Sequence, residues 1–103
     1  MAVIEIKETE FADKIKNSNN KVLIDCYASW CGPCKLLSPI LDDVANEVDN
    51  CDFYKINIDE ANEIVNKYNI MSIPTILIFE NNELVTRTMG LKTKEEIKGL
   101  IRN

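Results

Sequence analysis

The chain has 103 residues, which is enough for one domain spanning residues 1–103 but not for two domains that each bury a core. Hydrophobic residues make up 46% of the sequence and charged residues 28%, which argues against a disordered or fibrous protein. The formal net charge of −5 disfavours nucleic acid and anionic membrane surfaces as partners, because both carry negative charge.

The first part of the chain alternates between strand-like and helical patterns. Its three shortest predicted elements are a strand at 3–6, a helix at 11–15 and a polar turn at 17–20. An apolar run at 22–28 has the length of a strand, and only Asp25 interrupts it, which is typical of a central strand buried on both faces. Apolar residues then recur at helical spacing over 34–48, where Pro39 is expected to kink the helix.

The second part of the chain continues this alternation and then breaks it. Residues 51–58 have strand character, and Asp59 is expected to cap a following helix. The inner face of that helix is predicted from apolar residues at helical spacing, namely Ala61, Ile64, Val65 and Tyr68. Strands at 75–79 and 84–89 flank Asn81-Asn82, which predicts a hairpin because asparagine tolerates a positive φ.

The chain ends in a predicted amphipathic helix. Thr93 and Glu96 have the Thr-x-x-Glu spacing of a capping box, and the apolar face consists of Ile97, Leu100 and Ile101. The order β-α-β-α-β-α-β-β-α implies parallel strands joined by crossover helices, followed by one antiparallel hairpin. We therefore predict an α/β fold with a central mixed sheet of about five strands, flanked on both faces by about four helices.

No basic segment followed by an apolar run opens the sequence, and no apolar stretch approaches the roughly 18 residues needed to span a membrane. We therefore expect a cytoplasmic protein without a membrane partner. Structural disulfides are rare in such a reducing compartment, so the four cysteines point to redox chemistry, a metal site or core packing.

Two of these cysteines lie in the segment Trp30-Cys31-Gly32-Pro33-Cys34-Lys35, where the buried strand passes into a helix. The unpaired N–H groups and the dipole of a helix N-terminus favour a thiolate, so Cys31 is the candidate nucleophile for disulfide exchange. Cys34 lies within one helical turn and is the candidate resolving thiol. A C-x-x-C pair also occurs in zinc sites and at haem attachment points, so the spacing alone leaves these functions open.

The same segment looks like the active site of the thioredoxin family, and the resemblance extends over nearly the whole chain. Asp25 stands where the family has a buried aspartate behind the resolving cysteine, Pro74 where it has a cis-proline, and Gly90 where it has a glycine beside the substrate groove. The resemblance implies the thioredoxin fold and a thiol–disulfide oxidoreductase in which Cys31 attacks a target disulfide and Cys34 resolves the mixed disulfide.

Residue chemistry leaves two roles open for Asp25. Burial raises the pKa of a carboxyl, so Asp25 either accepts the proton of Cys34 or is a structural group satisfied by a hydrogen bond or by Lys55. The resemblance favours the role of base. Lys55 matches a family lysine near this aspartate, but a lysine in a strand also fits a solvated face.

The resemblance also implies a surface that binds the substrate chain. It places the backbone of Ile73 against an extended substrate and makes the Ile73–Pro74 bond cis, where the residues alone favour an ordinary turn. Trp30 and Met71 would complete the apolar contact surface around Cys31, although large apolar residues also commonly belong to a core.

Cys26 and Cys51 are extra relative to the family pattern and give rise to two non-enzymatic alternatives. Counted from Cys26, the first three cysteines have the opening spacing of a plant-type [2Fe–2S] ferredoxin. A zinc module would need Cys26 and Cys51 to converge on the C-x-x-C pair. Against both, Cys26 lies within a strand pattern, the chain has no histidine, and cysteine commonly packs as a small hydrophobic residue. Cys51, near the start of a strand, is open to partial exposure.

Further positions depart from the family pattern without touching its chemistry. Tyr27 stands where a second tryptophan is common, and Ser29 stands where an acidic residue is common. Three others stand where many members have glycine: Asn69, Ser72 and Asn82. Because asparagine adopts a positive φ at some cost, the turn geometry is in question at these positions.

The resemblance implies a redox carrier that needs no cofactor or metal of its own. A separate thioredoxin reductase, either flavin-containing and NADPH-dependent or ferredoxin-linked, would restore the dithiol, and the other partners would be disulfide-containing target proteins. Gly32 and Pro33 between the cysteines resemble the reducing members of the family. We expect a monomer that binds neither nucleic acid nor membrane.

Overall fold

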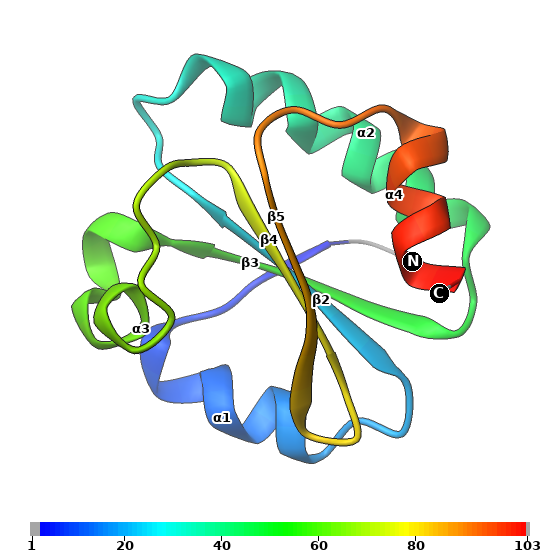
Figure 1. Ribbon diagram of the computed structural model, residues 1–103, viewed down its shortest axis with the longest axis horizontal. Helices are drawn as coiled ribbons and strands as arrows, with labels where there is room; N and C mark the ends of the chain where they lie inside the picture. Colours follow the sequence, from blue (N-terminus) through cyan, green and yellow to red (C-terminus); the bar gives the residue numbers. More distant parts are fainter. Residues whose placement is uncertain (1–2, 103) are drawn as a thin grey trace.

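A five-stranded sheet runs through the middle of the molecule, with helices on both of its faces (Figure 1). The computed structural model describes residues 3–102. Its elements in chain order are β1 (Ile4–Glu5), α1 (Glu8–Lys16), β2 (Lys21–Tyr27), α2 (Gly32–Glu47), β3 (Cys51–Asn57), the 3₁₀ turn η1 (Ile58–Glu60), α3 (Asn62–Lys67), β4 (Thr75–Glu80), β5 (Glu83–Met89) and α4 (Lys94–Arg102). The predicted α/β fold, with its mixed sheet and four flanking helices, is confirmed within the described residues.

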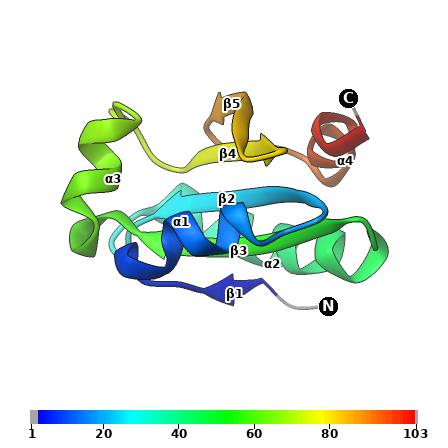
Figure 2. The ribbon, with the colours of Figure 1, turned by 90° about the horizontal axis from the view of Figure 1, so that it is seen from below.

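The strand order is β1-β3-β2-β4-β5, so the strands are not arranged in chain order. β1, β3 and β2 are parallel neighbours, whereas β4 runs antiparallel to β2, and β5 runs antiparallel to β4. Figure 2 shows the β4–β5 hairpin and α4 stacked at one side of β2. The C-terminal end of β2 leads directly into the loop before α2, at the centre of the sheet.

Alternating side chains of β2 point into two separate cores. Val22, Ile24 and Cys26 belong to the core that α1 and α3 cover, whereas Leu23 belongs to the core that α2 and α4 cover. These two helix pairs lie on opposite sides in Figure 1. Asp25 follows Leu23 by two residues and therefore faces the α2 side of the sheet. No helix within residues 3–102 is both long enough and apolar enough to cross a membrane.

The hairpin turn and the capping box that were predicted from short sequence patterns are both present in the structure. Asn81 and Asn82 have φ of 52° and 66°, which is the pair of positive angles that a two-residue hairpin turn of type I′ requires. At the start of α4, the N–H of Thr93 donates to Oε1 of Glu96 (2.9 Å), and the N–H of Glu96 donates to Oγ1 of Thr93 (3.1 Å). The predicted hairpin and capping box are both confirmed.

The predicted cap of α3 is wrong. Asp59 lies in η1 rather than at the start of a helix, and Ala61 occupies the N-cap of α3 without a side-chain hydrogen bond. The acceptor comes instead from α1, where Oε2 of Glu8 accepts the backbone N–H of Ile64 at 2.9 Å. Ala61, at 0% exposure, is too buried and too short to be a polar cap, so a carboxylate from another element satisfies the helix.

Several element boundaries also differ from their predicted positions. Helix α1 begins at Glu8, three residues before the predicted start. Its N-cap residue is Lys7, whose backbone N–H donates to Oε1 of Glu10 at 2.9 Å and so stabilises this earlier start. Ile58 belongs to η1 rather than to β3. Helix α2 begins at Gly32 and contains Pro39, and the kink at that proline stays a prediction.

Candidate redox-active site

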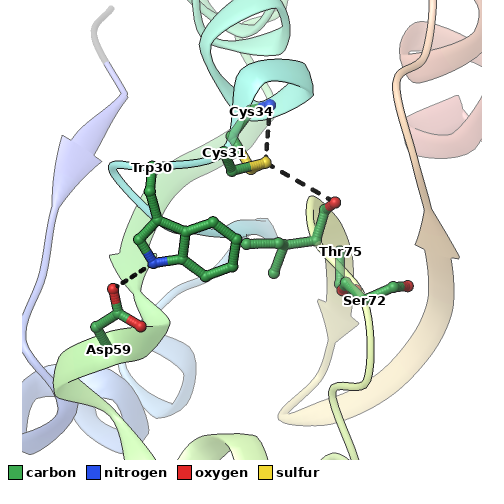
Figure 3. The surroundings of a disulfide bond; sticks show 7 residues. Trp30, Cys31, Cys34, Asp59, Ser72 and Thr75 are labelled. Carbon is green, nitrogen blue, oxygen red and sulfur yellow. Dashed lines mark hydrogen bonds between the residues drawn. A yellow bond between two sulfur atoms is a disulfide. The ribbon is translucent and has the colours of Figure 1, made fainter.

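Cys31 and Cys34 form a disulfide at the N-terminus of α2, with their Cα atoms 5.3 Å apart (Figure 3). Cys31 is the N-cap residue of α2 and has extended backbone angles, φ −93° and ψ 113°. Pro33 lies in the first turn, where the lack of an N–H costs no helical hydrogen bond. Cys34 therefore lies at the third helical position, one turn from the cap.

The backbone N–H of Cys34 donates to Sγ of Cys31 at 3.2 Å. This N–H has no partner within the helix, because the first turn has no preceding carbonyl to accept it. After reduction the same donor would point at a Cys31 thiolate, and a hydrogen bond to an ionised acceptor is stronger than one to a neutral acceptor. The N–H of Cys34 and the N-terminus of α2 thus favour a thiolate at Cys31 over a thiolate at Cys34.

The loop before β4 lies against the disulfide. The Ile73–Pro74 peptide bond is cis, and the carbonyl oxygen of Ile73 lies 3.9 Å from Sγ of Cys31, a van der Waals contact because a disulfide sulfur carries no proton. The N–H of Gly90 donates to the carbonyl of Pro74 at 2.8 Å, and Gly90 has a φ of 89°. The cis bond that the resemblance implied is confirmed, and the alternative of an ordinary turn before β4 is wrong.

Trp30 and Met71 are exposed rather than part of a core. The side chain of Trp30 is 67% exposed, and that of Met71 is 82% exposed. The indole Nε1–H of Trp30 donates to Oδ2 of Asp59 at 2.8 Å, which fixes the ring beside the disulfide (Figure 3). The alternative that these two residues are core residues is therefore wrong, because both leave a large apolar side chain exposed to solvent.

A cavity of about 260 Å³ joins Asp25 to Cys34 behind the disulfide. It is lined by Asp25, Tyr27, Ala28, Ser29, Cys34, Lys35, Ser38 and Lys55. Asp25 is 2% exposed, and its Oδ1 has no hydrogen-bond partner among the described residues. Burial raises the pKa of this carboxyl from its ordinary value of 3.8 to about 7, although the positive charge of Lys55 lowers it. The carboxyl therefore exchanges protons near neutral pH.

Lys55 lines the same cavity and is held there by its neighbours. It lies opposite Asp25 in the register of β2 and β3, and its Nζ lies 5.9 Å from the centroid of the Tyr27 ring. The hydroxyl of Tyr27 donates to Oε2 of Glu5 on β1 at 2.5 Å. Burial and the Glu5 carboxylate together raise the pKa of Tyr27. Lys55 is thus half-buried beside Asp25 rather than part of a fully solvated face.

Cys26 and Cys51 are free thiols that lie in two different cores. Both are 0% exposed, and burial raises the pKa of each thiol to about 12. Cys26 packs in the core on the α1 side of the sheet and Cys51 in the core on the α2 side, so the sheet separates them. The four cysteines therefore do not converge, which removes the geometric basis of the zinc and [2Fe–2S] alternatives. The partial exposure considered for Cys51 is wrong.

Sequence reasoning missed two residues of this site. Asp59 was expected at a helix cap, yet it is the partner of Trp30, and Tyr27 was interpreted as a packing replacement although it lines the cavity. No local signal could have found either contact, because Asp59 and Trp30 are 29 residues apart and Tyr27 meets Glu5 from a different strand. Of the three positions that replace glycine, Asn69 and Asn82 have positive φ and Ser72 does not.

Comparison with known proteins gives a consistent result over the whole chain. A model of the thioredoxin family matches residues 2–103. The thioredoxin of Mycoplasmoides gallisepticum (strain R(low / passage 15 / clone 2)) is 41% identical over 90 residues, which are 87% of this chain and 90% of that protein. The thioredoxin of Bacillus subtilis (strain 168) is 37% identical over 102 residues, which are 98% of this chain and 96% of that protein.

Solved structures agree with these relatives. A mutant thioredoxin from Halobacterium salinarum NRC-1 superposes with a TM-score of 0.89 at 32% identity, over 98% of this chain and 88% of that chain. Chloroplastic thioredoxin z superposes with a TM-score of 0.90 at 29% identity, over 99% of this chain and 93% of that chain.

Proposed function

The chain belongs to the thioredoxin family and is a thiol–disulfide oxidoreductase, and from this we propose that it reduces disulfides in target proteins, with Cys31 as nucleophile and Cys34 as resolving thiol. The observation that carries the assignment of the two roles is the N–H of Cys34 directed at Sγ of Cys31. It supports a thiolate at Cys31, and the thiolate is the species that attacks a disulfide.

The reaction proceeds in two exchanges. The Cys31 thiolate attacks one sulfur of the target disulfide, the target S–S bond breaks, and its second sulfur leaves as a thiolate that takes up a proton. Cys34 then loses its proton and attacks Sγ of Cys31, which releases the first target sulfur as a thiol. The target gains two electrons from the Cys31–Cys34 pair, which becomes a disulfide, and it gains two protons, one replacing the proton lost by Cys34 and one taken from solvent.

Asp25 is the base that we propose for the second exchange. Its carboxyl shares a cavity with Cys34, its Oδ1 is unpartnered, and its pKa near 7 lets it take up a proton at neutral pH. Lys55 holds part of the Asp25 population ionised, because its charge opposes the effect of burial. Gly32 and Pro33 keep the two cysteines within one turn during the exchange.

The substrate chain is proposed to lie across the surface beside Cys31. Ile73 and Pro74 would present backbone to it, Gly90 would leave room for its close approach, and Trp30 and Met71 would contact its apolar side chains. The exposure of the last two residues supports this role, because apolar side chains at an exposed site gain free energy when a partner covers them.

Recycling requires a second protein. Members of the family have reductase partners and disulfide targets, and we propose a flavin-containing, NADPH-dependent or ferredoxin-linked thioredoxin reductase as the electron donor for this chain. The protein would act as a monomeric redox carrier in the cytoplasm, where Cys26 and Cys51 stay reduced.

A turbidity assay of insulin reduction by dithiothreitol tests this function. Wild type should accelerate the reaction, and Cys31→Ser and Cys34→Ser should each lower the acceleration by at least about tenfold, because one thiol cannot complete the exchange. Cys34→Ser should also accumulate a mixed disulfide with a target peptide, detected by intact mass, whereas Cys31→Ser should not. Cys26→Ala is the matched control and should keep full activity. Equal activity of Cys31→Ser and wild type would refute the assignment.

A further inference from the structure

Two exposed methionines lie at the rim of the surface proposed to bind the substrate. Met71 is 82% exposed and precedes the Ser72–Thr75 segment beside the disulfide (Figure 3). Met89 is 52% exposed and lies at the end of β5, directly opposite Thr75 on β4. Exposed apolar side chains gain free energy when a partner covers them, so both methionines are available to contact a bound chain.

A hydrogen bond connects the residue that follows Met71 to the sulfur of Met89. The hydroxyl of Ser72 donates to Sδ of Met89 at 3.1 Å, and the carbonyl of Ser72 accepts the hydroxyl of Thr75 at 2.6 Å. Ser72 follows Met71 directly, so one short segment holds Met71 and engages Met89. The N–H of Gly90, next to Met89, is bound to Pro74, which keeps the end of β5 against the same segment.

We propose that Met71 and Met89 form a paired methionine oxidation site that controls the docking of protein disulfides at Cys31. A hydroperoxide is the oxidant. The thioether sulfur attacks the outer peroxide oxygen, the O–O bond breaks, a sulfur–oxygen bond forms, and water or an alcohol leaves. The sulfur loses two electrons to the peroxide, and the product is a methionine sulfoxide. This inference rests on the proposed function, because it concerns regulation of that site.

Oxidation changes the surface in a direction that opposes binding. A sulfoxide is polar and strongly hydrated, so an apolar substrate side chain would have to displace bound water from it. The disulfide itself is not altered, and neither is the Trp30–Asp59 contact. Oxidation should therefore weaken docking of a protein substrate while leaving exchange with a small aromatic disulfide unchanged, because a small disulfide reacts with Cys31 and Cys34 without covering the two methionines.

The two sulfurs should react at different rates. Met71 has the greater exposure, and within residues 3–102 its sulfur accepts no hydrogen bond of the kind that Met89 accepts from Ser72. The Ser72 hydroxyl occupies a lone pair of Met89, which lowers the nucleophilicity of that sulfur. We expect Met71 to oxidise about threefold faster than Met89, and Ser72→Ala to raise the Met89 rate about twofold.

The experiment uses the intact protein with its disulfide formed, so that Cys31 and Cys34 cannot react with peroxide. Dilute hydrogen peroxide is added, the oxidation of each methionine is followed by peptide mapping, and the protein is then reduced with dithiothreitol, which leaves sulfoxides intact. Insulin reduction and reduction of a small aromatic disulfide are measured before and after treatment. We expect KM for insulin to rise about fivefold after oxidation, with an unchanged rate on the small disulfide.

The double variant Met71→Leu with Met89→Leu is the matched control. Whatever its untreated activity, its ratio of treated to untreated activity should stay at one. A loss in this variant, or an equal loss on both substrates, would overturn the proposal. Wild type that reduces insulin equally well before and after oxidation would overturn this inference and leave the proposed function standing. Untreated wild type without insulin activity would overturn both.

Discussion

Asp25 is an ionisable side chain in a place where ionisation is costly. Its carboxyl is 2% exposed, one oxygen has no partner among residues 3–102, and Lys55 offsets only part of the cost of burial. A group of this kind destabilises the folded state when it is charged, so its position in a core strand fits the role of base proposed above better than a role in stability.

Replacing Asp25 by Asn should therefore stabilise the protein at neutral and alkaline pH. The pKa of Asp25 is about 7 in the folded state and near 3.8 when unfolded, so between these values the folded state binds a proton that the unfolded state does not. Stability of wild type falls as pH rises through this window and is level above it. At about 1.4 kcal/mol per pKa unit, the advantage of the variant grows to as much as about 4 kcal/mol.

Urea unfolding of the oxidised protein between about pH 4.5 and about pH 8.5 measures this difference, because the disulfide form removes the titration of Cys31 and Cys34. Asn is nearly the size of Asp, so packing is kept and the charge alone changes. A difference in stability that is the same at every pH would contradict the assignment of the titration to Asp25.

At the scale of the elements, α3 depends on a residue from another helix. It has six residues, too few to be stable alone, and within residues 3–102 its N-cap residue makes no side-chain hydrogen bond, so Oε2 of Glu8 accepts the N–H of Ile64 instead. Glu8→Ala should lower the free energy of unfolding by about 1 kcal/mol, the usual cost of losing a cap. Denaturant titration measures the change.

Glu8→Gln is the matched variant for this cap. Its amide oxygen can still accept the N–H of Ile64, so it should lose less than half as much stability as the alanine variant. Equal losses in the two variants would mean that charge, rather than the hydrogen bond, explains the effect of Glu8 on α3.

The elements also show which predictions sequence could support. The hairpin at Asn81-Asn82 and the capping box of Thr93 and Glu96 were predicted because each depends on residues within four positions. The cap of α3 could not be predicted, because Glu8 and Ile64 are 56 residues apart. A polar residue near a helix start, here Asp59, was the better local candidate and was wrong.

At the scale of the whole molecule, periodicity was sufficient for the class of fold and the mixed sheet, but not for the strand order or the two cores. The cysteine pair could be identified from sequence because its residues lie in one turn. The contacts of Trp30 with Asp59 and of Ser72 with Met89 could not, because each joins separate segments that only the folded sheet brings together.

Because Cys26 and Cys51 are buried, the number of thiols that react with a reagent reports the redox state of the Cys31–Cys34 pair. Cys26 and Cys51 are fully buried with pKa raised to about 12, so a thiol reagent should not reach them in the folded protein. Brief labelling at about pH 8 should modify no thiol other than Cys31 and Cys34 when that pair is reduced, and no thiol at all when the pair is oxidised. Labelling of a third thiol on this time scale would contradict their burial.

Slow labelling of Cys26 and Cys51 reports how often each core of the folded protein opens. Because Cys26 lies in one core and Cys51 in the other, each can be modified only when its own half of the interior opens. The ratio of their modification rates, read by mass spectrometry, compares the opening free energies of the two halves. The chain thus contains native reporters of whether its two sides unfold together or one after the other.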